Sequence, residues 1–284
     1  MSCPDCFKGA VHDGVPAGKE EAIHGVRTYV ASVSTPSIST SKPTIIFITD
    51  AFGFNLPNSK LLADYYALRT GFRVLVPDII PGGGVPLSSL SLMEIITSPV
   101  KWWDIWGQIR RAVTIIRMMI VVIPFARRTK NVFPSLLMYA RSVKSEGGKL
   151  GVAGFCWGGL QTTKLSQEPS VEGGKEALVN AHFTAHPAGL KGPDDFVEGV
   201  GKFDVPLSMA VGDRDFVLSK EKVAEVEAGL RQEFGEGVEK FEVRIYKGCG
   251  HGFAVRADPG KTIENEAAGR AAEQAVQWFK SFLS

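Results

Sequence analysis

The sequence predicts an α/β protein in which a mostly parallel sheet carries helices on both faces. Short β-branched runs alternate with amphipathic stretches along most of the chain. Two of the runs, "IIFI" and "VLV", are apolar throughout, which is typical of strands buried on both faces. One long segment, about residues 82–130, has no evident strand and is interpreted as a helical cap insertion. We expect residues 1–284 to form one domain around a single sheet.

Seven segments are expected to be strands because they are short, apolar and bounded by turn residues. In chain order they are residues 26–32, 44–49, 72–77, 149–154, 179–184, 206–211 and 241–246. Five amphipathic stretches are expected to be helices. They cover about residues 58–68, 134–145, 157–166, 219–234 and 263–282.

The cap segment contains apolar residues that recur at steps of four and three, which places them on one face of a helix. They are Trp102, Trp106, Ile109, Val113, Ile116 and Ile120. We expect this face to cover the mouth of a site at the sheet's upper edge, with Trp106 lining an apolar pocket. The uncharged run from Met118 to Ala126 has nine residues, against the ~20 that a membrane span requires. A membrane-surface or dimer-forming helix is the alternative interpretation.

The composition is that of an ordinary soluble globular protein, with 44% hydrophobic and 22% charged residues. The formal net charge of +2 gives no reason to expect a nucleic-acid or membrane partner. Four cysteines in a chain of this length suit a reducing compartment, and the N-terminus lacks the apolar core of a secretory signal. We therefore expect a cytoplasmic protein, either a monomer or a homodimer, without a cofactor.

Cys3 and Cys6 form a C-x-x-C motif near the N-terminus. A zinc site would need two further ligands, and His12 and His24 fit the usual spacing poorly. A thioredoxin-like motif would follow a strand and open a helix, and this one lies before the first predicted strand. We therefore expect neither a metal site nor a redox role at these cysteines.

Cys156 lies in the stretch Gly154-Phe155-Cys156-Trp157-Gly158, between a predicted strand and a predicted helix. This is the G-x-S-x-G frame of the nucleophile elbow of α/β-hydrolases, with a thiol in place of the hydroxyl. Glycines suit the frame because the turn is strained and the helix passes close to the neighbouring strands. The alternative is a buried, structural cysteine at a glycine-rich turn.

A nucleophilic cysteine needs a base and a group that orients the base. In α/β-hydrolases the order along the chain is nucleophile, acid and histidine, each after a strand. Here Asp213 and Asp215 follow the strand at 206–211, and His251 follows the last predicted strand. We favour Asp215 because the loop turns into the next helix there, whereas Asp213 suits a local turn hydrogen bond. The predicted triad is Cys156, Asp215 and His251.

Acyl transfer also needs N–H donors for the developing oxyanion. We expect one donor from Trp157, at the start of a helix, and a second from Ala51, in the loop after the strand at 44–49. In the same loop, Phe52 is a candidate to contact the substrate. Asp50 is either an acid that modulates the thiol or a loop-capping residue. His186 is a candidate to line the site, with a buried structural histidine as the favoured alternative.

The stretches "GFCWGG", "FRVLVPD", "DAFGFNLPNSKLLAD" and "HGFAVR" resemble those of the dienelactone hydrolase family, in particular its fungal branch. The resemblance covers nearly the whole chain and is weakest in the cap. It implies an α/β-hydrolase fold with a Cys–His–Asp triad, which maps to Cys156, His251 and Asp215. It also implies that Asp50 pairs with the thiol, at the place where the bacterial enzymes have a glutamate.

Bacterial members of the family also hold the substrate carboxylate with arginines. After "VPDIIP" this sequence has three glycines instead, and Arg256 in "HGFAVR" is the residue nearest to the second arginine. We therefore expect a substrate other than dienelactone itself. An apolar pocket would favour a medium-length acyl chain over a small, doubly charged acid.

The leading hypothesis is a cysteine-dependent hydrolase that forms an acyl-enzyme from a small ester, lactone or thioester. The runner-up is a thioesterase-like cyclase that releases a polyketide acyl chain as a lactone. In that case an acyl carrier protein would be a partner, and its phosphate would meet basic residues of the cap, which otherwise form a solvated face. These residues are Arg110, Arg111, Arg117, Arg127 and Arg128. A third hypothesis is a non-catalytic binding protein on a hydrolase scaffold, which a complete triad disfavours.

Overall fold

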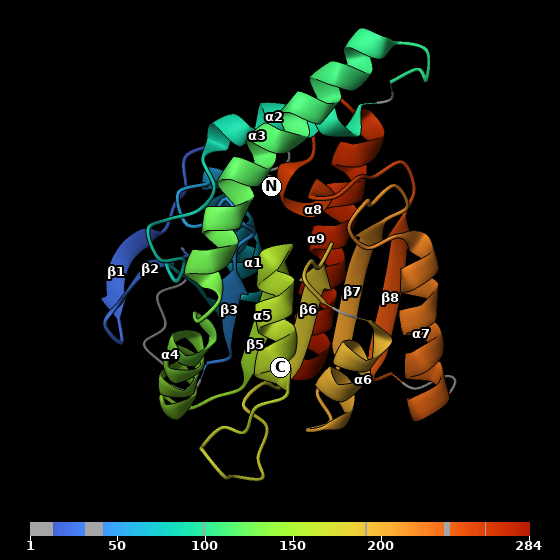
Figure 1. Cartoon of the computed structure of the whole chain (residues 1–284). Coiled ribbons are helices and arrows are strands. Elements are labelled where there is room, and N and C mark those ends of the chain that lie inside the picture. The colour runs from blue at the N-terminus through green and yellow to red at the C-terminus, as the bar shows by residue number, and fades with distance from the viewer. Residues whose placement is uncertain (1–13, 32–41, 99, 191, 236–238, 259) are drawn as a thin grey trace.

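The computed structural model describes residues 14–31, 42–98, 100–190, 192–235, 239–258 and 260–284 (Figure 1). These residues contain a sheet of eight strands in the order β1-β2-β4-β3-β5-β6-β7-β8. The strands are β1 (Lys19–Ile23), β2 (Val26–Val30), β3 (Thr44–Ile48), β4 (Arg73–Pro77), β5 (Leu150–Phe155), β6 (Ala181–Ala185), β7 (Leu207–Gly212) and β8 (Phe241–Tyr246). Strands β3 to β8 pair in parallel, and β2 and β1 extend one edge in the antiparallel direction. The predicted fold class is confirmed.

The helices that were expected from amphipathic stretches are present. They are α1 (Pro57–Thr70), α4 (Phe133–Ser145), α5 (Trp157–Ser166), α7 (Lys220–Phe234) and α9 (Thr262–Leu283). Two further short helices, α6 (Pro193–Gly201) and α8 (Phe253–Arg256), were not predicted. The cap segment contains the 3₁₀-helix η2 (Leu87–Ser89) and the helices α2 (Leu90–Thr97) and α3 (Ile105–Thr129).

The continuous apolar run of β3 packs into the hydrophobic cores on both faces of the sheet. Ile45 and Phe47 belong to the core that the sheet shares with α1 and α9, whereas Ile46 and Ile48 belong to the core on the other face, shared with α4 and α5. All four side chains are fully buried. Side chains alternate between the two faces of a strand, so a strand covered on both faces needs an unbroken apolar run.

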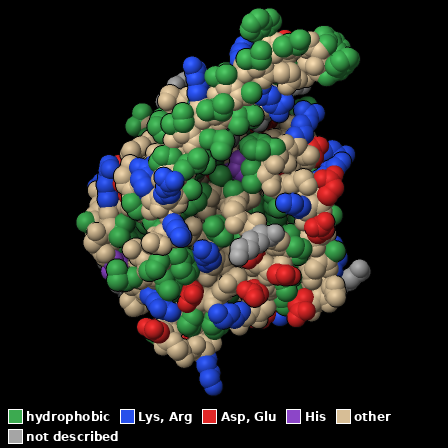
Figure 2. Space-filling model, in the orientation of Figure 1, with side chains coloured by type: hydrophobic (Ala, Val, Ile, Leu, Met, Phe, Trp, Pro, Cys, Tyr) green, Lys and Arg blue, Asp and Glu red, His purple; other side chains and the backbone are tan. Residues whose placement is uncertain are grey.

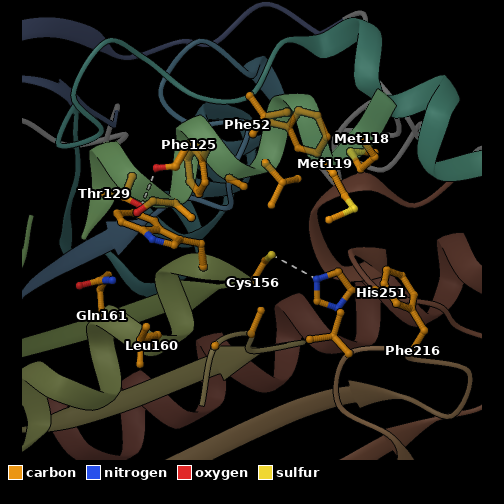
Figure 3. A pocket seen from close by; sticks show the side chains of 18 of the residues that line it. Phe52, Met118, Met119, Phe125, Thr129, Cys156, Leu160, Gln161, Phe216 and His251 are labelled. Atoms are coloured by element: carbon orange, nitrogen blue, oxygen red, sulfur yellow. Dashed lines mark hydrogen bonds between the residues drawn. The ribbon is translucent and has the colours of Figure 1, made fainter. Parts of the chain in front are cut away.

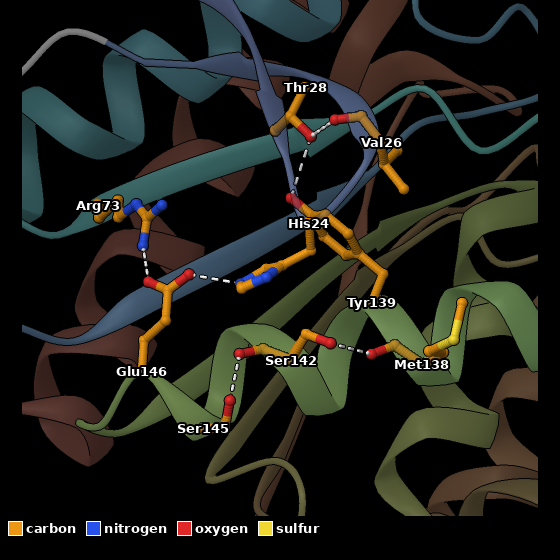
Figure 4. Close-up of polar contacts among 9 residues, drawn as sticks. All are labelled: His24, Val26, Thr28, Arg73, Met138, Tyr139, Ser142, Ser145 and Glu146. Atoms are coloured by element: carbon orange, nitrogen blue, oxygen red, sulfur yellow. Dashed lines mark hydrogen bonds and ion pairs between the residues drawn. The ribbon is translucent and has the colours of Figure 1, made fainter.

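Strand β1 was not predicted, and its sequence "KEEAI" is exposed over most of its length. It joins β2 through a two-residue turn in which His24 and Gly25 both have positive φ angles, 47° and 77°. His24 Nε2 lies 2.6 Å from Glu146 Oε1, and the same carboxylate pairs with Arg73 (Figure 4). Polar contacts stabilise strand β1 at this edge of the sheet. Because strands were predicted from apolar runs, β1 was missed.

The cap helix α3 begins after Asp104, whose Oδ1 accepts a hydrogen bond from the N–H of Gly107 at 2.9 Å. Its N-terminal part projects beyond the body of the molecule, and the helix then descends toward α4 (Figure 1). In the described part of the chain, no helix combines the length and the apolar character that crossing a bilayer requires.

Candidate active site

Cys156 lies on a sharp turn between the end of β5 and the start of α5. Its backbone has φ 51° and ψ −116°, a conformation that is strained for a residue with a side chain. Gly158 lies so close to the backbone of β3 that a Cβ atom there would clash with the carbonyl groups of Ile48 and Thr49. The glycine therefore lets α5 start directly against the sheet, and the turn presents the thiol at the carboxyl ends of the parallel strands.

The structure brings the three predicted triad residues together. His251 Nε2 lies 3.1 Å from Cys156 Sγ (Figure 3). His251 Nδ1 lies 3.0 Å from each carboxylate oxygen of Asp215. The carboxylate of Asp213 instead accepts a hydrogen bond from the N–H of Gly248 at 2.7 Å, within the loops that follow β7 and β8. The two aspartates thus have different partners: Asp215 faces His251, and Asp213 binds the backbone of Gly248.

The carboxylate of Asp215 is fixed from two sides. Besides facing His251, its Oδ1 accepts hydrogen bonds from the N–H groups of Val217 and Leu218, at 2.8 and 3.1 Å. Burial alone would raise the pKa of Asp215, but the hydrogen bond and charge of His251 outweigh burial and hold it below its usual value. The side chain is therefore an ionised carboxylate at neutral pH.

His251 is almost completely buried, and burial alone would lower its pKa. The negative charge of a Cys156 thiolate and the hydrogen bonds to Asp215 and Cys156 act in the other direction and raise the pKa to about 10. The arrangement favours an imidazolium between the Asp215 carboxylate and the Cys156 sulfur. This is the charge state in which a thiolate can act as a nucleophile at neutral pH.

Asp50 and Arg256 form a buried ion pair beside the triad. Asp50 Oδ1 also accepts a hydrogen bond from the N–H of Phe52 at 3.0 Å, and the guanidinium of Arg256 lies 4.8 Å from the centre of the Phe52 ring. Burial lowers the pKa of Arg256 to about 10, which leaves it charged at neutral pH. The structure thus gives Asp50 the loop-capping contact considered from the sequence, and pairs it with an arginine as well.

A cavity of about 670 Å³ opens above Cys156, and most of the residues that line it are apolar (Figure 3). Ala51 and Trp157, the predicted oxyanion-hole residues, line it together with Phe52, His251 and Arg256. The cap contributes Val85, Ile96 of α2 and a row of residues from α3, namely Ile115, Met118, Met119, Val122, Phe125, Ala126 and Thr129. The far end lies between α3, α4 and α5, where the side chains of Lys130 and Lys164 border it.

The prediction that Trp106 lines this pocket is wrong. Its side chain is 80% exposed and lies outside the cavity lining, and Trp102 is 83% exposed. The spacing of apolar residues identified a shared helix face correctly from Trp106 to Ile120, whereas Trp102 lies before the helix begins. α3 also carries a second apolar face, and it is the second face that covers the cavity. A signal for it was present in the sequence, because Met118, Val122, Phe125 and Thr129 also recur at steps of four and three.

His186 does not line the cavity either, and lies behind the triad. It is completely buried with φ 40°, and its ring centre is 5.1 Å from that of His251. Neither of its ring nitrogens has a hydrogen-bond partner among the residues that the structure describes, and burial lowers its pKa to about 3. It is a neutral ring packed against His251, which matches the structural alternative considered from the sequence.

Cys249 is the remaining cysteine in the part of the chain that the structure describes. Cys249 is fully buried, and burial raises its pKa to about 11, so it remains a thiol. Among the described residues, no group of three or more His, Cys, Asp and Glu side chains could hold a metal ion. Cys3, Cys6 and His12 lie outside the described residues.

Comparison with known proteins places this chain in a family. The sequence profile of the dienelactone hydrolase family matches residues 26–283. The chain belongs to this family. It is 27% identical to hydrolase pyvD of Aspergillus violaceofuscus over 98% of this chain and 96% of that protein. It is 26% identical to dienlactone hydrolase 1 of Gibberella moniliformis, over 98% and 93% of the two chains.

Solved structures show the same fold. A dienelactone hydrolase from Klebsiella pneumoniae, described as putative, superimposes with a TM-score of 0.62 at 17% identity, over 95% of this chain and 100% of that one. Carboxyl esterase 2 of Tuber melanosporum superimposes with a TM-score of 0.54 at 15% identity, over 100% and 93% of the chains. Like the family to which it belongs, the protein is a hydrolase of ester or lactone bonds.

Proposed function

We propose that this dienelactone hydrolase family member cleaves its substrate through an acyl-enzyme on Cys156. The observation that carries the proposal is the continuous chain of contacts from Asp215 through His251 to the Cys156 thiol, at the floor of an apolar cavity. A non-catalytic scaffold would have no need to hold these three groups at hydrogen-bonding distance inside a cavity.

In the first half of the reaction, the Cys156 thiolate attacks the carbonyl carbon and a C–S bond forms. The resulting oxyanion lies within reach of the N–H groups of Trp157 and Ala51, which border the cavity beside the thiol. The N–H of Trp157 is at the first position of α5, where helix N–H groups have no partner within the helix. His251 then donates its proton to the departing alcohol or thiol, and the bond to the leaving group breaks.

In the second half, the neutral His251 accepts a proton from water while the water oxygen attacks the acyl carbon. Collapse of the second tetrahedral species breaks the C–S bond, releases the carboxylic acid and restores the thiolate–imidazolium pair. Asp215 keeps Nδ1 of His251 protonated throughout, so that Nε2 faces the thiol and the water.

The lining of the cavity supports an apolar acyl group as the substrate. Met118, Met119 and Phe125 lie opposite Cys156 and offer no polar group to a second carboxylate (Figure 3). The charge of Arg256 is already balanced by Asp50. The proposed substrates are therefore esters, lactones or thioesters with a medium-length acyl chain that is apolar where it meets Met118, Met119 and Phe125.

Trapping of the acyl-enzyme tests this function. Wild-type protein and the Cys156→Ala variant are mixed with a panel of p-nitrophenyl esters, quenched in acid and examined by intact-mass and peptide-mass spectrometry. We expect an acyl adduct on the peptide that contains Cys156 and a loss of turnover of about three orders of magnitude in the variant. Turnover within tenfold of wild type in Cys156→Ala would overturn the mechanism. Analysis of the released product separates hydrolysis, which gives the free acid, from ring closure, which gives a lactone.

A further inference from the structure

Exposed apolar side chains are concentrated on the cap. Of the twenty large apolar side chains that are exposed in the described residues, twelve lie between Trp102 and Ile123. The other eight are distributed over the rest of the described chain, and isolated exposed apolar residues are common on protein surfaces. A contiguous exposed apolar surface instead indicates an interaction site.

We call the side of α3 that points away from the cavity the outward face. It consists of Trp102, just before the helix, with Trp106, Ile109, Val113, Ile116 and Ile120. Trp102 and Trp106 are more than three-quarters exposed, at the projecting end of the helix. Figure 2 shows hydrophobic side chains gathered at this projecting end and along the cap, with Lys and Arg side chains beside them.

The charge of the cap is strongly one-sided. Residues 82–130 contain seven Lys and Arg residues and two acidic residues, Glu94 and Asp104, and the carboxylate of Asp104 caps α3. The whole chain has a net charge of only +2, so the rest of it is net negative. Arg110, Arg117 and Arg128 are separated by seven and eleven residues, close to two and three helical turns, and therefore form a basic stripe along one side of the outward face.

We propose that the outward face of α3 docks on the surface of a membrane that contains anionic lipids. An apolar face rich in Trp and Ile, bordered by arginines, is the pattern of a helix that lies in the plane of a membrane interface. Tryptophan is also the residue that membrane interfaces favour. A second copy of the chain is the less suitable occupant, because two such faces in contact would bring like charges together, whereas lipid phosphates complement them.

Docking of the outward face would bring the membrane surface close to the cavity. Ile115, Met118 and Val122 line the cavity from the other side of the same helix, so that α3 alone lies between the outward face and the apolar space above Cys156. An apolar ester that partitions into lipid would then be concentrated beside the cavity. This consequence rests on the proposed function, whereas the docking itself does not.

Vesicle flotation of the full-length protein tests the docking. The vesicles contain phosphatidylcholine alone or phosphatidylcholine with one third phosphatidylserine. We expect the protein to float with the anionic vesicles, to do so less as salt is added, and to show blue-shifted tryptophan fluorescence when bound. Arg117→Gln should reduce binding to anionic vesicles about fivefold, and Arg270→Gln in α9, which also removes one positive charge, is the matched control.

A second pair of variants tests the apolar contribution. Ile120→Glu should abolish flotation, whereas Ile263→Glu, which replaces an isoleucine of similar exposure on α9, should not. Hydrolysis of a soluble short ester should be unchanged in Ile120→Glu, because Ile120 lies outside the cavity lining, so that a docking defect and a catalytic defect are distinguishable. Absence of flotation with anionic vesicles for the folded wild type would overturn the proposal. So would a wild-type dimer in solution that Ile120→Glu converts to a monomer without any vesicle binding.

Discussion

Apolar residues are buried at the elbow around Cys156 but largely exposed in the cap. At the elbow, Phe155 is fully buried and each of the proposed catalytic groups is held by contacts from several elements, so the sheet sets the position of the thiol. In the cap, buried positions along α3 are few, namely Thr114, Phe125 and Thr129, and large apolar side chains face solvent. The difference indicates that the sheet positions the proposed catalytic residues. α3 covers the cavity with one face and exposes its outward face to solvent. Substitutions in the two regions should therefore affect different properties of the protein.

The largest expected effect is on turnover, at the acid of the triad. Asp215→Asn should lower kcat about 10²- to 10⁴-fold, because the amide permits the wrong tautomer of His251. Asp213→Asn is the matched control in the same loop, and its amide oxygen can still accept the hydrogen bond from Gly248. We expect that variant to stay within about threefold of wild type, since its contact is structural. Steady-state kinetics on one p-nitrophenyl ester gives kcat for both variants. A larger loss of kcat in Asp213→Asn than in Asp215→Asn would reassign the acid to Asp213.

The next largest effect is on stability, and it compares an arginine of the site with one of the cap. Arg256→Met leaves the Asp50 carboxylate buried without its cation, and loss of one partner of a buried pair costs about 3–5 kcal/mol. Arg117→Met, on the exposed side of α3, should change the free energy of unfolding by less than about 0.5 kcal/mol. Urea denaturation of both variants gives the comparison. Equal stabilities would show that the Asp50–Arg256 pair is solvated in solution.

A third prediction concerns pH and sharpens the electrostatic picture of the site. Because the pKa of His251 is raised to about 10, the imidazolium persists through neutral pH, and kcat/KM should fall only as the pH rises through that alkaline value. The hydrogen bond and charge of Asp215 contribute to the increase in the pKa of His251. The alkaline limb in Asp215→Asn should therefore move to lower pH, and the residual activity of this variant suffices to measure it. If the alkaline limb of the kcat/KM profile lies at the same pH in Asp215→Asn as in wild type, then Cys156 alone sets the charge of His251.

The amount that the sequence could predict differs between the two regions for a physical reason. Cys156, Asp215 and His251 each follow a predicted strand, and the carboxyl ends of parallel strands meet at one edge, so chain order was enough to bring them together. The side of a helix that faces a cavity is not fixed by spacing when two faces are apolar, and α3 has two. Strand β1 escaped prediction because ion pairs such as that of Arg27 with Glu20 stabilise it, not burial. Phe216, which lines the cavity from the loop after β7, carried no periodic signal.

The smallest effect, on substrate preference, separates the two faces of α3 directly. Met118 lines the cavity, so Met118→Ala should enlarge the space above Cys156 and raise kcat/KM for a long p-nitrophenyl ester relative to a short one, by about fivefold. Trp106→Ala removes a larger side chain from the same helix, but that side chain is 80% exposed and outside the cavity lining. Its ratio of kcat/KM values for the two esters should stay at the wild-type value when the esters are free in solution. A shift of the ratio in Trp106→Ala that equals the shift in Met118→Ala would mean that the projecting end of α3 folds back over the site during turnover, and the separation of the two faces would then fail.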